Sequence, residues 1–409
     1  MAATRTPTNF PRIMTAIAPI YEICNLNGNG GFAQLPTLLQ EGRFEDVLCP
    51  NKLNDALSKL FEMDGWRRLG GRFRQRSDSG LEIHVPREFT EERPAVYFTK
   101  EEFDTPMSEH PLASRLPKPT GAISTYTGPK EFCALGFRTE TPRNMDDFVH
   151  SDIPQFCLHV QTFKDGTLVN LTFSHVTTDL MGLSAIFEGW SQVLAGKPEA
   201  VIQMSGYRKD LFDDMLESPP KESHVLADKI LDGWRFKVWG LRSLYESWKS
   251  SNIQSRTLCI PKDTRGRCFR RSFMPMAVDH RSRARSVFLP DKTYIQNSPT
   301  DAFVFCHANR ILDLPLGKLA LQVREAIQAQ TTVEQLKAST ALSVESMKTN
   351  NMPVVFGSTN MAAQFMPNWS KGDLAEKLDF SPAIEQEKMW IDLMDYLEQF
   401  NRADRESKL

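Results

Sequence analysis

The sequence lacks the features that mark several specialised classes of protein. No stretch approaches the roughly 18 consecutive apolar residues of a membrane-spanning helix. Lys+Arg total 49 against 51 for Asp+Glu, and this balance excludes a strongly basic nucleic-acid binder and a strongly acidic tail protein. With Gly 22 and Pro 25 in 409 residues, the chain is not collagenous or of low complexity. What remains is an ordinary globular composition, long enough for about two or three domains or one large α/β unit.

Cysteines are few, odd in number and scattered. No Cys-x-x-Cys pair occurs among the seven, which are Cys24, Cys49, Cys133, Cys157, Cys259, Cys268 and Cys306. This pattern is typical of free thiols in a reducing compartment, and not of a disulfide framework or a zinc site. Asp146, Asp147, His150 and His159 also lack the spacing of metal ligands. We therefore expect a cytoplasmic protein that holds no metal.

The apolar run Ile13–Ile20 is the nearest approach to a secretory signal. It is short, contains Pro19, and is followed by no clear cleavage site of small residues. We expect this run to form a buried N-terminal strand or loop.

The clearest structural unit is a hairpin followed by a helix. Phe156–Phe163 and Thr167–Ser174 have the character of strands, with an Asp-Gly turn between them. Apolar residues then recur at helical spacing over residues 183–194. His175 is therefore expected on the short link between a strand end and a helix.

Further elements are expected on both sides of this unit. Trp66, Trp190 and Trp390 lie on apolar faces and are expected in the core. The patterns predict a helix over 52–63, a hairpin that ends near 85, strands at 256–260 and 353–358, and helices that begin near 316, span 331–343 and span 390–400.

His175 and Asp179 are the first candidates for chemistry. A histidine at a strand end can project into a cavity and, with an ordinary pKa of about 6.5, take a proton at neutral pH. Asp179 could accept a hydrogen bond from the second ring nitrogen or anchor the turn that aims the ring, and Gly182 lets the helix start close to other backbone. The alternative is structural: Asp179, Ser174 or Thr178 caps the helix, and His175 is a half-buried turn residue.

A second candidate is a cluster of arginines in the second half of the chain. These cations could bind phosphate groups of a ligand, or form a solvated loop with one or two buried ion-pair partners. No aromatic interleaving supports a nucleic-acid surface, so no nucleic-acid partner is expected. The cluster consists of Arg265, Arg267, Arg270, Arg271, Arg281, Arg283 and Arg285.

Several segments, taken in order, resemble one family. Phe-Ser-His-Val-Thr-Thr-Asp-Leu-Met-Gly at 173–182 resembles the His-x-x-x-Asp-x-x-Gly motif of the BAHD-type acyltransferases. It is most similar to their fungal relatives, the trichothecene 3-O-acetyltransferase-like O-acyltransferases of secondary metabolism. Matching segments follow the family order at 57–72, 81–86, 93–96, 279–283, 294–297 and 316–324.

This resemblance implies a fold and a function. The fold is α/β, with two chloramphenicol-acetyltransferase-like lobes, each a mixed sheet flanked by helices, and a channel between them. Residues 1–200 would form the N-terminal lobe, 201–250 the crossover, and 251–409 an apparently shortened C-terminal lobe. The function is transfer of an acyl group, most simply acetyl, from acyl-coenzyme A to a hydroxyl of a terpenoid, meroterpenoid or polyketide. Acyl-coenzyme A and a small alcohol are then the partners, without a resident cofactor, and the chain is expected to be a monomer.

The resemblance also assigns roles to residues of the motif. His175 is the general base that deprotonates the acceptor hydroxyl. Asp179 orients the loop and pairs with Arg281 or Arg283, and these arginines otherwise bind the coenzyme. Gly182 belongs to the structural part of the motif. A thioester needs no enzyme nucleophile, and no Gly-x-Ser-x-Gly elbow is present.

The second family signature, Asp-Phe-Gly-Trp-Gly, has only a loose counterpart here. Trp369, Asp379 and Phe380 match it without either glycine, and the resemblance gives them a structural role. Compared with the family, the chain is short between 261 and 279 and after 381. The alternative function is therefore a catalytically impaired, truncated relative that acts as a binding protein. A condensation-type enzyme is disfavoured because Ser174, not a second histidine, precedes His175.

Overall fold

The computed structural model describes residues 13–16, 20–21, 37–75, 81–117, 122–127, 129–207, 211–249, 256–259, 274–305, 315–350, 354–361 and 369–385. Three sequence predictions lie outside these residues. They concern the terminal helix over 390–400, the core position of Trp390, and the arginines between 265 and 271.

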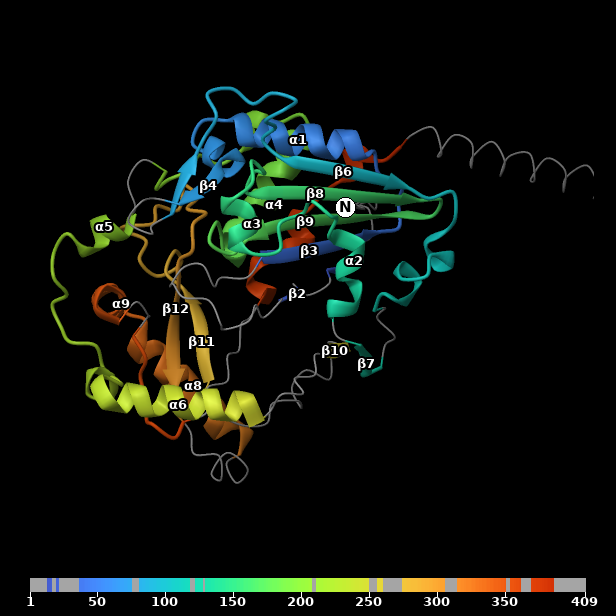
Figure 1. The fold of residues 1–409 in the computed structure, drawn as a ribbon. Coiled ribbons are helices and arrows are strands. Elements are labelled where there is room, and N and C mark those ends of the chain that lie inside the picture. Colours follow the sequence, from blue (N-terminus) through green and yellow to red (C-terminus); the bar gives the residue numbers. More distant parts are fainter. Residues whose placement is uncertain are drawn as a thin grey trace, which may run out of the picture.

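A six-stranded sheet within the described residues carries His175 at the end of one of its central strands. The strand order is β1-β3-β9-β8-β6, and β2 pairs with β3 beside this path. β6 and β8 are parallel and the other pairs are antiparallel. The N-terminal run that was expected to form a strand or loop contains β1 and the start of β2, and β2 is labelled in Figure 1. The strands are β1 (Ile13–Ala16), β2 (Ile20–Tyr21), β3 (Thr37–Phe44), β6 (Tyr97–Glu102), β8 (Phe156–Phe163) and β9 (Gly166–Ser174).

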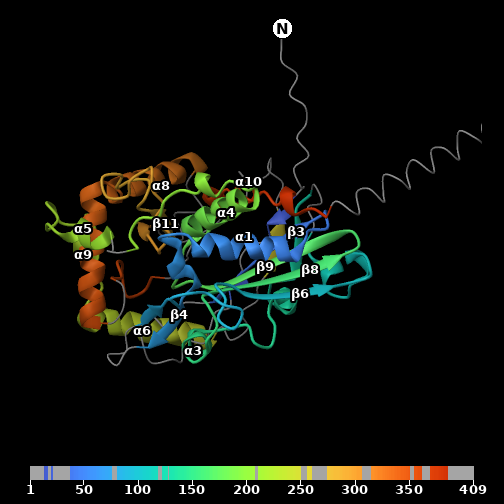
Figure 2. The ribbon, with the colours of Figure 1, turned by 90° about the horizontal axis from the view of Figure 1, so that it is seen from above.

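Two helices cover one face of this sheet. α1 (Pro50–Glu62) and α4 (Leu180–Leu194) lie side by side over it (Figures 1 and 2). α1 presents Leu53 and other leucines at helical spacing to the core. The indole N–H of Trp190 in α4 donates to the carbonyl of Leu53 at 2.9 Å. Trp66 and Trp190 are both buried, so their predicted core positions are confirmed.

A smaller sheet and several helices follow in the second half of the chain. β11 (Met274–Asp279) and β12 (Pro299–Val304) pair in antiparallel fashion. α8 (Leu316–Gln330) and α9 (Val333–Asn350) pack against β12. The side chain of Gln330 bonds to both the N–H and the carbonyl of Phe303, at 2.8 and 2.9 Å, and so joins the end of α8 to β12. α6 (Gly233–Lys249) lies at the periphery in both views (Figures 1 and 2).

Short elements complete the described structure. β4 and β5 form the predicted hairpin, and β7 pairs with β10, which comes much later in the chain. Their bounds are β4 (Arg72–Gln75), β5 (Leu81–His84), β7 (Ser124–Thr127), α2 (Cys133–Gly136), α3 (Met145–Val149), α5 (Leu211–Leu216), β10 (Arg256–Cys259) and α10 (Leu374–Lys377).

One predicted strand is wrong. Residues 354–361 make only an isolated bridge, between Phe356 and Ile230, where a strand at 353–358 was expected. Phe356 is fully buried against Phe303, with ring centroids 5.1 Å apart. Gly357 has a φ of 139°, which interrupts the extended backbone directly after it. The apolar run therefore contributes one buried side chain, Phe356, to the core and does not pair as a strand of a sheet.

Other differences concern helix extents. The helix expected over 331–343 continues to Asn350, and the segment expected as a crossover contains α5 and α6. In the described residues, no helix combines the length and the apolar character needed to cross a membrane.

Candidate active site

His175 follows β9 directly and lies on the short link to α4. Its ring is half-buried. Nδ1 is buried and has no hydrogen-bond partner among the described residues. Burial of Nδ1 leaves Nε2 as the nitrogen that can meet a ligand. An imidazole nitrogen that carries no hydrogen can accept one from a ligand.

Asp179 holds this link in place by four hydrogen bonds. Its Oδ1 accepts from the N–H of Gly182 at 3.0 Å, so Asp179 is the N-cap of α4 and not Ser174 or Thr178. Arg281 donates through Nη2 to Oδ1 at 3.0 Å and through Nη1 to Oδ2 at 3.1 Å. The N–H of Ser298 donates to Oδ2 at 2.8 Å. These bonds use the carboxylate fully, and each of them goes to a group other than the ring of His175.

Arg281 is the cationic partner, at the turn after β11. Its five N–H donors are all used: besides Asp179, they bond to Asp279 at 2.7 Å and to the carbonyls of Tyr294 at 2.6 Å and Gln296 at 2.5 Å. Burial alone would lower the pKa of Arg281, but the carboxylates of Asp179 and Asp279 outweigh it and raise this pKa above its ordinary value. Arg281 therefore acts within the protein and has no donor left for a phosphate.

Asn297 holds the backbone of His175 in place. Its side-chain amide donates to the carbonyl of His175 at 2.6 Å and to that of Val176 at 3.1 Å. Sequence reasoning placed Asn297 only in a matching segment and gave it no role. The signal was weak, because its partners are backbone carbonyls more than a hundred positions away in sequence.

Gly182 permits a close approach of α4 to the same distant segment. A Cβ atom at this position would collide with the carbonyl of Ile295 and with the hydroxyl of Thr178. Thr178 is buried and donates to that carbonyl at 2.6 Å. Three stretches, 175–182, 279–281 and 294–298, therefore meet at one point.

A cavity of about 330 Å³ opens beside the ion pair. Arg281, Arg285 and Lys292 are among the residues that line it. The guanidinium of Arg283 instead reaches the backbone carbonyl of Asp279 at 3.4 Å. The cavity wall thus carries two exposed cations, Arg285 and Lys292, next to the arginine that anchors the loop.

The counterpart of the second signature lies along α4. Phe380 is fully buried, with its ring centroid 4.6 Å from Trp190 and 5.3 Å from Phe44. Asp379 Oδ1 accepts from the N–H and hydroxyl of Ser381, at 3.0 and 2.6 Å. For Trp369 the structure gives only a place at the start of a short 3-10 helix. This segment therefore packs against α4, and none of these contacts involves His175.

A buried polar cluster lies on the sheet face opposite α1 and α4. His159 is 3% exposed, and its Nε2 accepts from Nε of Arg138 at 3.0 Å while Nδ1 bonds to Thr99 at 2.8 Å. Burial and the charge of Arg138 lower the pKa of His159 to about 4, although Glu101 opposes the change. His159 is therefore neutral at physiological pH. No set of side chains suited to a metal ion occurs in the described part of the chain.

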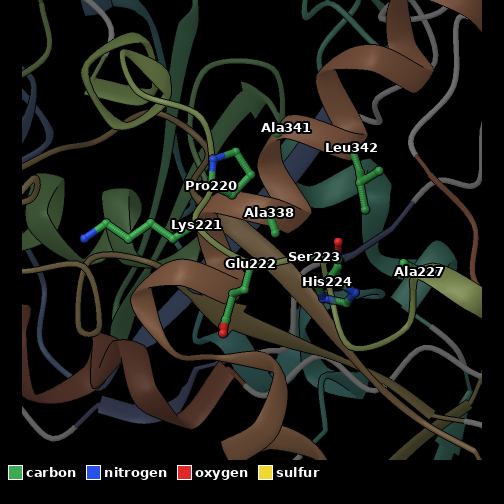
Figure 3. Close-up of a pocket in the computed structure, with 9 residues that line it drawn as sticks. All are labelled: Pro220, Lys221, Glu222, Ser223, His224, Ala227, Ala338, Ala341 and Leu342. Carbon is green, nitrogen blue, oxygen red and sulfur yellow. The ribbon is translucent and has the colours of Figure 1, made fainter.

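A second cavity, of about 400 Å³, lies between the segment 220–227 and α9 (Figure 3). His224 lines it, but burial lowers the pKa of this side chain. Its Nδ1 accepts from the N–H of Leu226 at 3.2 Å, and its ring stacks on Phe356. These contacts are typical of a histidine with a structural role, so we assign this cavity no part in the chemistry.

Comparison with known proteins assigns the family. No family model matches the chain. The chain is 30% identical to acetyltransferase adrJ of Penicillium rubens over 391 residues, which cover 84% of this chain and 78% of the relative. It is 29% identical to O-acyltransferase pboC of Aspergillus ustus, over 84% of this chain and 81% of the relative. Among solved structures it is similar to F. graminearum TRI101 in complex with coenzyme A and T-2 mycotoxin, with a TM-score of 0.49, 13% identity, and coverage of 86% and 84%.

The chain belongs to a family of fungal acetyltransferases and O-acyltransferases. The fungal O-acyltransferase family that the motif at 173–182 suggested is thereby confirmed, and so is the class of enzyme, an acyltransferase. The described elements form the mixed α/β structure that was expected. The division into two lobes and the channel between them stay predictions.

Proposed function

We propose that this chain transfers an acyl group, most simply acetyl, from acyl-coenzyme A to a hydroxyl of a fungal secondary metabolite, with His175 as the general base. The observation that carries the proposal is the anchoring of the histidine link. Asp179 with Arg281 fixes one end of the link, and Asn297 fixes the other. A base works only if it is held in position, because misplacement by about 1 Å can cost roughly 10²-fold in rate.

The proposed chemistry uses Nε2 of His175, because Nδ1 is buried in the protein. Nε2 of His175 takes the proton of the acceptor hydroxyl while the oxygen attacks the carbonyl carbon of the thioester. A C–O bond forms and the C–S bond breaks. The coenzyme thiolate leaves and takes the proton back from the imidazolium, so the enzyme is unchanged after each turnover. Positioned general-base catalysis supplies roughly 10²–10⁴-fold in rate.

The coenzyme phosphates have candidate partners near the loop. Arg285 and Lys292 line the cavity beside Arg281, and they can form charge-assisted hydrogen bonds with phosphate oxygens. Arg283 is half-buried at the base of the same turn and remains a candidate for this role. Arg281 is not, because its donors are used. Replacing Arg285 or Lys292 by Ala should therefore raise KM for acetyl-coenzyme A more than it lowers kcat.

One observation argues against the alternative, a catalytically impaired binding protein. Asp179 and Arg281 form a largely buried ion pair, and a chain that loses one partner of such a pair is strongly destabilised. Because both partners are present, we favour a chain in which this loop still functions.

We extend the proposal to a monomeric protein of the cytoplasm, which sedimentation and cell fractionation can test.

The experiment combines binding with turnover. Calorimetry measures the affinity of the purified chain for acetyl-coenzyme A, and mass spectrometry measures ester formation with a panel of terpenoid and polyketide alcohols. We expect binding and at least one acetylated product. Binding without any product across the panel would favour the alternative, and absence of both would contradict the proposal.

A further inference from the structure

α6 carries an exposed apolar stripe that the proposed chemistry does not use. Trp234, Val238, Leu241, Tyr245 and Trp248 recur at intervals of four and three residues and therefore share one face of the helix. Their exposed fractions run from 42% for Val238 to 77% for Trp248. Large aromatic side chains are seldom this exposed, and a contiguous apolar patch marks an interaction site.

The opposite face of α6 is the one that meets the protein. Phe236 and Trp239 are half-buried there, and their ring centroids are 5.8 Å apart. The outward direction of the stripe is therefore fixed by packing on the inner face. The helix lies at the periphery in both views, where a partner can reach it (Figures 1 and 2).

Cations border the stripe on both sides. At about 100° per residue, Arg242 and Lys249 lie along one edge of the stripe and Lys237 along the other. Arg235 lies on the same edge as Arg242, but it is half-buried and its Nη1 donates to the carbonyl of Ile230 at 3.5 Å. Glu246 is the one acidic residue in the sequence of this helix. The chain as a whole has a net charge of -2, whereas the sequence of this helix holds four cations and one anion.

We propose that α6 binds the surface of an anionic membrane. Trp and Tyr rings place an apolar body in the lipid and a polar edge in water, and flanking Lys and Arg side chains reach the headgroups. α6 would lie in the interface and not span it. A second copy of the chain is the other occupant to consider, but pairing two such stripes would bring cationic borders of the same sign together.

The proposal is independent of catalysis, since no residue of α6 belongs to the histidine link. Contact with a membrane would explain why apolar side chains occupy the exposed side of α6. The proposed function includes terpenoid alcohols among the acceptors, and for an apolar acceptor of this kind docking on a membrane would also bring the enzyme to the phase in which the acceptor concentrates.

Co-sedimentation of the full chain with vesicles tests the proposal. Vesicles of phosphatidylcholine with added phosphatidylserine should bind the chain, and vesicles of phosphatidylcholine alone should bind it much less. Added salt should weaken the binding. The double variant Arg242→Gln/Lys249→Gln should lower the partition constant on the anionic vesicles about 30-fold.

The apolar contribution needs its own variants. Trp234→Ala/Trp248→Ala should lower the partition constant by about tenfold or more. Leu321→Ala, which removes another exposed apolar side chain on α8, is the matched control and should bind as wild type. Far-UV circular dichroism and urea midpoints should show that all three variants stay folded.

Three results would overturn the proposal. The first is equal binding to neutral and anionic vesicles. The second is full binding by the tryptophan double variant. The third is a dimer in sedimentation velocity that the same double variant converts to a monomer, because α6 would then bind a second copy.

Discussion

Replacing Asp179 by Asn probes how the histidine link is held. The variant keeps the shape of the side chain and an oxygen for the N–H of Gly182, but it removes the charge that faces Arg281. Removing one partner of a buried ion pair costs about 3–5 kcal/mol. Asp279 remains on Arg281, and the paired side chains of Asp179 and Arg281 keep 11% and 14% of their surface exposed. We therefore expect a loss of about 2–3 kcal/mol in the free energy of unfolding.

The same variant should also lower activity, for a positional reason. Asp179 does not touch the ring, so the proton transfer itself is unaltered, but a shifted link misplaces Nε2. We expect kcat to fall by about 10²-fold. Urea unfolding followed by tryptophan fluorescence measures the stability, and turnover of acetyl-coenzyme A measures the activity.

A double-mutant cycle decides whether the ion pair is the cause. Asp179→Asn, Arg281→Gln and the double variant should show a coupling energy of about 1–3 kcal/mol in stability. Additive losses would refute the reasoning, because Asp179 would then act through something other than Arg281. Wild-type stability of Asp179→Asn would refute it as well.

Three further predictions concern Gly182, the core residue Phe380 and the buried His159. Gly182→Ala should cost about 1–3 kcal/mol in urea unfolding and lower kcat, because its Cβ meets the carbonyl of Ile295; an unchanged kcat would contradict this packing. Phe380→Ala should cost about 3–5 kcal/mol in the same assay, since the ring is fully buried against Trp190, and a loss below about 1 kcal/mol would contradict its core role. His159 has a folded pKa of about 4 against an unfolded value of about 6.5. As pH falls from about 7 to about 4, the unfolded chain binds the proton first, so the free energy of unfolding should drop by up to about 3 kcal/mol. His159→Gln, unfolded at the same two pH values, should show a smaller drop.

The parts of the fold that follow local periodicity could be predicted. β8, β9 and α4 occupy the expected residues because alternation and helical spacing are properties of neighbouring side chains. The position of His175 followed from them. The strand expected at 353–358 was not formed, because pairing requires a partner that the local pattern does not specify.

The contacts that hold the site could not be derived from spacing. Asp179 and Arg281 were brought together by the family resemblance, and Asn297 had no role assigned, because its bonds go to backbone carbonyls that every residue has. Arg283 and Arg281 could not be told apart in sequence. Only the turn after β11 decides which guanidinium faces the carboxylate.

The most direct test of the central claim is the turnover number of His175→Ala beside that of His84→Ala. His84 is an exposed histidine on β5, and it is the matched control. With saturating acetyl-coenzyme A and an accepted alcohol, we expect kcat to fall by roughly 10²–10⁴-fold for His175→Ala and to stay at the wild-type value for His84→Ala. Ester formation by His175→Ala at an undiminished rate would contradict the assignment of the base.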